Sequence, residues 1–283
     1  MRIVALAISL LLAGCGSQPA PAEEASLRVM SFNIRFDNPG DGENAWPHRR
    51  DVVASQIRSH GADLVGVQEA LEHQLADLEA LIPDFARFGS GRTAELGGEF
   101  SAILYRTSRF ELLDHGTFWL SETPEMPGSR GWDAAYERIV TWGRLRDRRS
   151  GRRLLHFNTH FDHVGERARV ESARLLQRRI DAIAGPSDPV VLTGDFNTQP
   201  GSHPYRILTA SLADALEVSR TPHQGPTSTW NAFRAIEPER RIDFIFVRGP
   251  IEVLRHAILG ETFEGRFSSD HLPVIAEIRV SDE

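Results

Sequence analysis

The sequence predicts an α/β protein whose strands do not all run parallel. In the first third of the chain, two strand patterns alternate with two helix patterns, as in proteins with helices layered on a sheet. From residue 99 to residue 160, strand patterns follow one another with short turns and no helix between them, which indicates antiparallel pairing. The first pattern alone would suggest a doubly wound parallel sheet, and the second pattern argues against it.

Hydrophobic spacing defines the N-terminal elements. Residues 27–36 alternate apolar and polar side chains, as a half-buried strand does. Trp46 and Pro47 open a helix that ends before Gly61, because proline suits the first turn and glycine suits the position after the last turn. A buried strand follows at residues 62–69. The next helix has an apolar stripe formed by Leu71, Leu75, Leu78 and Ile82.

The remaining elements follow from the same patterns. Strands are expected at residues 99–105, 111–120, 140–146, 154–160, 189–195, 241–247 and 272–278, with a short strand-like segment at 227–230. Helices are expected at residues 166–184 and 203–212. The long segment 121–137 has no such pattern, and loops of that length in a compact domain usually serve a function.

Six of the strand segments have polar side chains, able to bind a metal or a phosphate, at or near one end. These side chains are Asn33, Glu69, His160, Asp195 with Asn197, Asp243, and Asp270 with His271. Side chains two residues apart in a strand point the same way, so Asp195 and Asn197 face a common space. Asp243 lies between apolar neighbours, where a carboxylate is costly without a partner, and a histidine would be a natural partner. Together they predict a polar site along one edge of the sheet assembly.

The segments that contain these residues resemble, in order and spacing, the motifs of the endonuclease/exonuclease/phosphatase superfamily. They are Ser31-Phe32-Asn33, Gln68-Glu69, Asn158-Thr159-His160, Gly194-Asp195-Phe196-Asn197, Arg241-Ile242-Asp243 and Ser269-Asp270-His271. The resemblance extends from about residue 27 to residue 280. It implies a four-layer sandwich, in which two mixed β-sheets pack face to face with helices on the outside, and a single domain over residues 27–283.

The resemblance also implies an activity, which is the metal-assisted hydrolysis of a phosphoester by in-line attack of water on phosphorus. Glu69 resembles the principal ligand of Mg²⁺ or Mn²⁺, with Asn33 beside it. Asp270 resembles a further carboxylate that lies near the metal or orients a neighbour. A cation at this place would offset the negative charge of the phosphate as water attacks.

The same resemblance assigns catalytic roles to five other residues. Asp195 resembles the group that orients or deprotonates the attacking water, and Asn197 and His160 those that hold phosphate oxygens. His271, oriented by Asp243, resembles the group that meets the charge developing on phosphorus. The roles of Arg138 and Arg167 stay open, because phosphate binding and ordinary ion pairs both fit them. The role of Asp162 stays open as well, since it could be a loop residue that ties down the long segment 121–137.

The N-terminus resembles a bacterial lipoprotein signal. Residues 1–14 contain Arg2 and an apolar stretch too short to span a bilayer, as in a signal peptide. Leu12-Ala13-Gly14-Cys15 resembles a lipobox, which implies a lipid on Cys15, a tether over residues 15–26 and a place in the bacterial cell envelope, at the outer membrane or its periplasmic face. The alternative is an ordinary signal peptide. Cys15 is the sole cysteine, so no intramolecular disulfide can form.

The net charge and the predicted location in the cell envelope narrow the range of expected substrates. The formal net charge is −7, which disfavours a long nucleic-acid footprint because such a footprint needs a basic track. We expect a monomer, held to the membrane only by its lipid, that acts on a phosphorylated small molecule, a lipid headgroup or a nucleotide. Residues 37–50 and 163–166 resemble deadenylase-like members, so a nuclease acting on RNA or DNA is the alternative. A catalytically silent binding module is disfavoured, because Glu69, Asp195 and His271 are all present.

Overall fold

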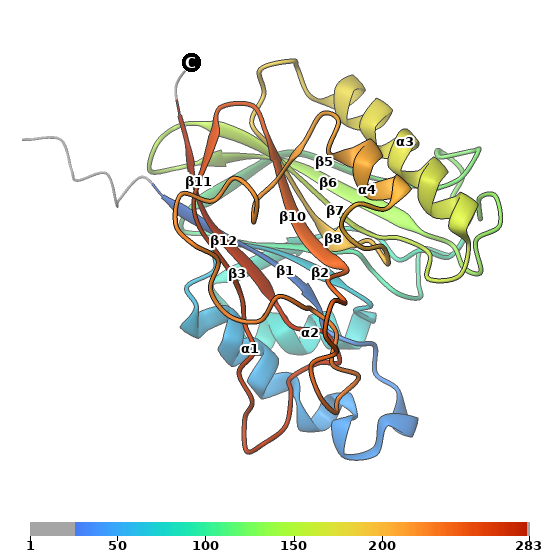
Figure 1. Ribbon diagram of the computed structural model, residues 1–283, viewed down its shortest axis with the longest axis vertical. Coiled ribbons are helices and arrows are strands. Elements are labelled where there is room, and N and C mark those ends of the chain that lie inside the picture. The colour runs from blue at the N-terminus through green and yellow to red at the C-terminus, as the bar shows by residue number, and fades with distance from the viewer. Residues whose placement is uncertain (1–25, 282–283) are drawn as a thin grey trace, which may run out of the picture.

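Two six-stranded sheets lie face to face between two pairs of helices in the computed structural model, which describes residues 26–281 (Figure 1). The predicted four-layer sandwich is therefore confirmed, and the doubly wound alternative is wrong. The predicted signal peptide and the predicted lipid site at Cys15 lie outside the described residues. Within residues 26–281, no helix is both long and apolar enough to cross a membrane.

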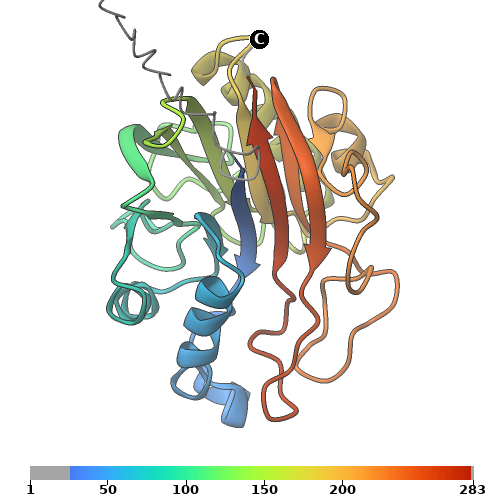
Figure 2. The ribbon, with the colours of Figure 1, turned by 90° about the vertical axis from the view of Figure 1, so that its left-hand side faces the viewer.

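The first sheet has the strand order β11-β12-β1-β2-β4-β3. Its strands are β1 (Leu27–Asn33), β2 (Leu64–Gln68), β3 (Phe85–Phe88), β4 (Ile103–Arg106), β11 (Ile251–Ile258) and β12 (Val274–Val280). Only β1 and β2 are parallel neighbours here, and β12 runs antiparallel to β1 at its other side (Figure 2).

The second sheet has the strand order β5-β6-β7-β8-β10-β9. Its strands are β5 (Phe110–Trp119), β6 (Ile139–Asp147), β7 (Arg153–His160), β8 (Val190–Asp195), β9 (Ala213–Asp214) and β10 (Asp243–Arg248). In this sheet β7 and β8 are the parallel pair, and the other neighbours are antiparallel.

Helices cover the outer face of each sheet. The helices are α1 (Arg50–Ser59), α2 (Glu72–Leu81), α3 (Glu166–Ile183) and α4 (His203–Leu208), with 3-10 turns η2 (Pro39–Asn44) and η3 (Trp46–His48) before α1. Figure 1 shows α1 and α2 beside the first sheet and α3 and α4 beside the second. One apolar core lies under each helix pair, and a third lies between the sheets, where Val29 and Val191 belong to the same cluster.

A polar bridge crosses the space between the sheets near the site. Gln68 Nε2 donates to Asn158 Oδ1 at 2.7 Å, and Asn158 Nδ2 donates to the carbonyl of Val67 at 2.8 Å. Gly66 makes this approach possible, because a Cβ atom there would lie 2.1 Å from Thr193 Oγ1 and 2.5 Å from Asn158 Oδ1. The bridge fixes how β2 lies against β7 and β8, whose ends form the site.

Several element boundaries differ from the sequence prediction. Residues 99–102 do not belong to β4, since Phe100 instead forms isolated bridges with Ala70 and Gly91. Residues 227–230 form no strand, and Trp230 makes a single bridge to His271. The helix at 203–212 ends at Leu208, and β3, β9 and β11 were not expected.

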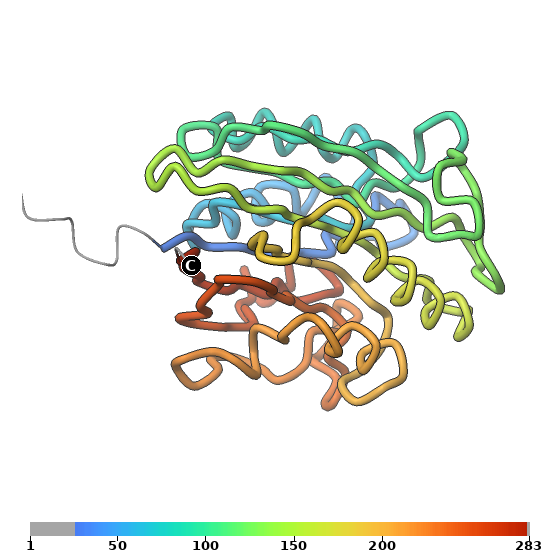
Figure 3. The backbone as a smooth tube through the Cα atoms, turned by 90° about the horizontal axis from the view of Figure 1, so that it is seen from above, coloured from blue at the N-terminus to red at the C-terminus, as the bar shows by residue number. Residues whose placement is uncertain are grey.

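Both ends of the described chain lie at the same end of the strands of the first sheet, opposite the end that carries the site. Leu27 at the start of β1 is paired with Ile278 near the end of β12 (Figure 3). The polar segments before β12 and after β1 therefore meet at the opposite end of these strands.

Candidate active site

The topology explains why the polar strand ends meet. β1, β2, β7 and β8 all end at one edge of the sandwich, whereas β10 and β12 run antiparallel to their neighbours and begin there. In the second sheet Asp195 is paired with His160 on one side and with Asp243 on the other. The eight residues predicted from the sequence lie at this edge, in segments from both sheets.

Asn33 is the centre of the hydrogen-bond network. Its Nδ2 atom donates to Glu69 Oε1 and to Asp195 Oδ2, both at 3.0 Å, and lies 3.5 Å from His271 Nε2. Its side-chain oxygen Oδ1 accepts from the backbone N–H of Arg35. In this arrangement Asn33 offers the two carboxylates a donor, and binding a cation through its oxygen would require the amide group to turn over.

Asp243 and His271 form a buried pair, with 2.8 Å between Asp243 Oδ2 and His271 Nδ1. Burial alone would lower the pKa of His271, but the charges of Asp243 and Asp195 outweigh burial and raise it above the usual value. The edge of the Trp230 ring packs on the imidazole, with 4.7 Å between ring centroids. The second nitrogen, Nε2, faces Asp195 Oδ2 at 3.7 Å, so an imidazolium would point into the site.

Asp195 has an unusual environment for a carboxylate. Burial is the main factor that raises its pKa, and the nearby charge of Asp243 raises it further, against the effect of His271. Its Oδ1 atom accepts the backbone N–H of Asn197, which is held in the left-handed region at φ 46°. A carboxyl whose pKa is raised in this way can exchange a proton near neutral pH, as the predicted role with water requires.

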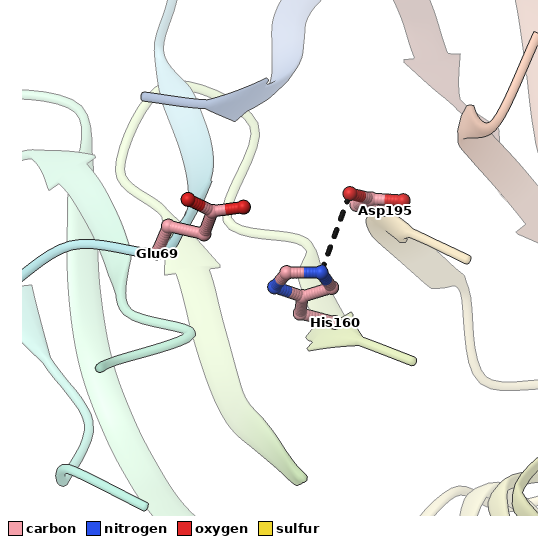
Figure 4. Close-up of side chains that lie close together, drawn as sticks. All are labelled: Glu69, His160 and Asp195. Carbon is pink, nitrogen blue, oxygen red and sulfur yellow. Dashed lines mark ion pairs between the residues drawn. The ribbon is translucent and has the colours of Figure 1, made fainter. Parts of the chain in front are cut away.

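His160 and Asn197 line the other side of Asp195. Asn197 Nδ2 lies 3.0 Å from His160 Nε2 and donates to the carbonyl of Phe161. His160 Nε2 is also 3.4 Å from Asp195 Oδ2 (Figure 4). Burial, and then the charges of Arg138 and His271, lower the pKa of His160 well below its usual value, which favours a neutral imidazole.

Glu69 offers the best place for a cation. Glu69, His160 and Asp195 each present a ligand atom within 4.8 Å of the others (Figure 4). A second such group, formed by Asp195, Asp243 and His271, is wholly buried and already closed by a hydrogen bond. Glu69 is partly accessible and adopts φ 62°, which is strained for a non-glycine residue. Both groups offer two carboxylates and one imidazole, but only the first is partly accessible and not closed by a hydrogen bond, so it fits Mg²⁺ or Mn²⁺ better than the second.

Asp270 stands somewhat apart from both groups. Its closest charged partner is Arg35, with 3.9 Å between Asp270 Oδ2 and Arg35 Nε, and Ser269 Oγ donates to its other oxygen. Burial raises its pKa. Arg35 in turn pairs with Asp41 and lies 3.9 Å from Glu69. Asp270 thus lies where its charge interacts with those of Arg35 and His271, next to the candidate cation site.

Two arginines near the site had no role assigned from the sequence, where that of Arg138 was left open. Arg49 is buried and donates to the backbone carbonyls of Ile34, Arg35, Asn44 and Ser268, which ties together the loops around Asn33 and Asp270. Arg138 is buried beside His160 and pairs with Asp162 at 3.5 Å. Their sequence neighbours gave no signal of burial, because their partners are distant along the chain. Arg167 is exposed, away from this group of contacts.

A sandwich of two sheets with a carboxylate–imidazole site at the strand ends defines a class of phosphoester hydrolases. The chain belongs to the Endonuclease/Exonuclease/phosphatase family, whose profile matches residues 30–271.

Among solved structures, an endonuclease/exonuclease/phosphatase from Bacteroides vulgatus is 39% identical, with a TM-score of 0.86 over 90% of this chain and 99% of the other. A mannosyl-6-phosphatase from Bacteroides thetaiotaomicron is 37% identical, with a TM-score of 0.84 over 89% of this chain and 99% of the other. Human Nocturnin is 22% identical over 93% of this chain and 67% of its own length. The chain spans only 44% of the length of another relative, a protein of Acanthamoeba polyphaga mimivirus.

Proposed function

We propose that the protein hydrolyses phosphate esters with the help of Mg²⁺ or Mn²⁺. The observation that supports this most is the position of the Glu69–His160–Asp195 group directly beside the buried Asp243–His271 pair. The first group offers ligands for a cation and an acid–base carboxyl, and the second offers a positive imidazole. Hydrolysis of a phosphate ester needs all three within one site.

Each residue has a role that its surroundings favour. Glu69 would hold the cation, assisted by Asn33 once its amide has turned over, and the bound cation would neutralise charge on the phosphate. Asp195 would position the water and accept its proton. His271, kept protonated by Asp243, would stabilise the charge that develops on the phosphate oxygens.

His160 and Asn197 would complete the phosphate site. Both side chains lie next to Asp195, and both carry N–H groups that could donate to phosphate oxygens. A neutral His160 leaves the cation and His271 as the main positive charges around the phosphate.

We further propose a phosphorylated small molecule, with sugar phosphates foremost, as the substrate. This rests on the similarity to the mannosyl-6-phosphatase at 37% identity, whereas Nocturnin and the Ccr4 exoribonuclease subunits are similar at 20–23%. The acidic net charge of −7 also fits a small substrate better than a long polynucleotide. Hydrolysis of RNA or DNA in preference to every small phosphate ester would contradict this substrate class.

The metal requirement gives the primary test. Excess EDTA should abolish hydrolysis of a phosphate ester, and added Mg²⁺ or Mn²⁺ should restore it. Glu69→Gln should lower kcat/KM by at least about a hundredfold, because a neutral amide holds a divalent cation poorly. Glu79→Gln is the control, since Glu79 pairs with Arg87 on the surface. Full activity after rigorous chelation would contradict the mechanism, and no activity on any ester would indicate a binding module.

A further inference from the structure

A small polar hollow lies beside Glu69 and His160, and none of the roles above uses it. It has a volume of about 10 Å³, enough for about one water molecule or one oxygen-sized group. The side chains around it that concern the argument are those of Glu69, Arg92, Glu99, Ser101, Arg138 and His160. We call it the hydroxyl pocket, for the reason developed below.

Arg92 and Glu99 form a fixed pair at the wall of the hydroxyl pocket. A hydrogen bond of 2.9 Å from Nη1 to Oε2 and an ion-pair contact of 2.7 Å between Nη2 and Oε1 join them. The Arg92 guanidinium also lies over the Tyr136 ring, 5.0 Å from its centroid. Such bidentate pairing on an aromatic face holds both side chains in place before a ligand arrives.

Arg138 and Ser101 complete the wall. Arg138 is only 5% exposed and is held by Asp162 at 3.5 Å and by His163 Nδ1 at 3.2 Å. Ser101 is 3% exposed, and its hydroxyl makes no hydrogen bond to any other residue within 26–281. The Ser101 hydroxyl is therefore free to hydrogen-bond to a group that enters the hollow.

The charges around the hydroxyl pocket select the kind of group that fits. Arg92 and Arg138 can only donate hydrogen bonds, whereas the carboxylates of Glu69, Glu99 and Glu137, which also lines the hollow, can only accept them. An additional phosphate oxygen would meet these carboxylates, and an ammonium group would meet two guanidinium groups. An alcohol hydroxyl both donates and accepts, so it can satisfy both kinds of wall.

We propose that the hydroxyl pocket binds a hydroxyl of the substrate's alcohol part, so that the protein selects phosphate esters of polyhydroxylated alcohols. This inference rests on the proposed phosphoesterase function, because the pocket shares Glu69 and His160 with that site. Glu99 and Ser101 would be the specificity-determining residues, since neither has another assigned role. A site built to hydrogen-bond a substrate hydroxyl discriminates strongly against analogues that lack it.

The test compares three phosphate monoesters in one assay: a hexose 6-phosphate, glycerol 3-phosphate and an alkyl phosphate without hydroxyls. The wild-type protein should show a kcat/KM at least about tenfold higher for one of the two hydroxylated esters than for the alkyl phosphate. The preferred ester shows whether the hydroxyl belongs to a sugar or to glycerol. Glu99→Gln should reduce this ratio by roughly ten- to hundredfold, as expected for a lost hydrogen bond to a charged group. Ser101→Ala, a gentler change, should reduce the ratio by about three- to tenfold.

The control and the contrary outcomes separate this inference from the proposed function. Glu79→Gln, which alters a surface carboxylate paired with Arg87, should leave the ratio unchanged. Equal losses on all three esters in both variants would overturn the hydroxyl pocket while leaving phosphoesterase activity established. A wild-type protein that prefers the alkyl phosphate would do the same. No hydrolysis of any ester by the wild-type protein would overturn the proposed function and this inference together.

Discussion

At the scale of single residues, the proposed mechanism depends on keeping one imidazole charged inside a buried site. Asp243 Oδ2 accepts from His271 Nδ1, and Asp243 Oδ1 is buried without a partner among the described residues. A carboxylate in that position is stabilised mainly by the imidazolium it holds. The two residues should therefore behave as one functional unit.

A double-mutant cycle tests this coupling. His271→Ala should lower kcat/KM by about 10²–10³, the usual cost of removing one charge-stabilising donor. Asp243→Asn should lower it through the same imidazole, so Asp243→Asn/His271→Ala should be little worse than His271→Ala alone. Losses that multiply would show that the two residues act independently. Melting temperatures of all three variants would check that they fold.

At the scale of elements, the packing of β2 against the second sheet determines where Glu69 lies in the site. Gly66 lies in β2 where the sheets come closest, and no side chain fits between its Cα atom, Thr193 and Asn158. The backbone there cannot withdraw without breaking the hydrogen bonds of Asn158 to Gln68 and to the carbonyl of Val67. Glu69, three residues later, is carried on the same backbone.

Gly66→Ala should therefore destabilise the protein by about 3 kcal/mol, the upper part of the range for overpacking a core. Urea unfolding followed by tryptophan fluorescence measures the change. Gly97→Ala is the control, because a Cβ atom at Gly97 would meet only Thr93 Oγ1, at 3.8 Å, and the change should stay within about 0.5 kcal/mol. A Gly66 variant as stable as the control would show that the sheets can separate without cost.

The same elements show how far the sequence could predict this structure. β2 and β8, which lead to Glu69 and Asp195, were predicted from short apolar runs, and β1, which leads to Asn33, from alternating apolar and polar residues. β7, which leads to His160, was predicted as one of several consecutive strand patterns. β11 alternates apolar and polar residues and could have been found, but the two-residue β9 is too short to leave a pattern. The Arg92–Glu99 pair could not be predicted, because two ordinary surface residue types become a wall only through their fold neighbours.

At the scale of the whole molecule, two buried histidines link stability to pH. Burial lowers the pKa of His156 from 6.5 to about 3. Burial, with the charges of His223 and Arg241, lowers the pKa of His256 to about 3 as well. Between about pH 6.5 and pH 3 the unfolded chain binds protons that the folded chain does not. The free energy of unfolding therefore falls as the pH falls through this window, by up to about 1.4 kcal/mol per pH unit for each histidine.

A variant that lacks one of these two histidines should show a weaker dependence of its unfolding free energy on pH. His256→Asn should reduce the slope of unfolding free energy against pH by up to about 1.4 kcal/mol per unit between pH 6 and 4. Urea titrations at several pH values give the slope for the variant and the wild-type protein. Identical slopes would mean that His256 is protonated in the folded state, contrary to its burial.

The pairing of the first strand with the last has a consequence for the order of events in the cell. β1 lies between β2 and β12, and the segment that contains Asp270 and His271 leads directly into β12. A nascent chain that has already delivered Glu69, His160 and Asp195 still lacks its imidazolium until the final strand has been synthesised and has docked beside the first. Under the proposed mechanism, partly made chains would therefore be catalytically silent, and hydrolysis would begin only with the completed sheet.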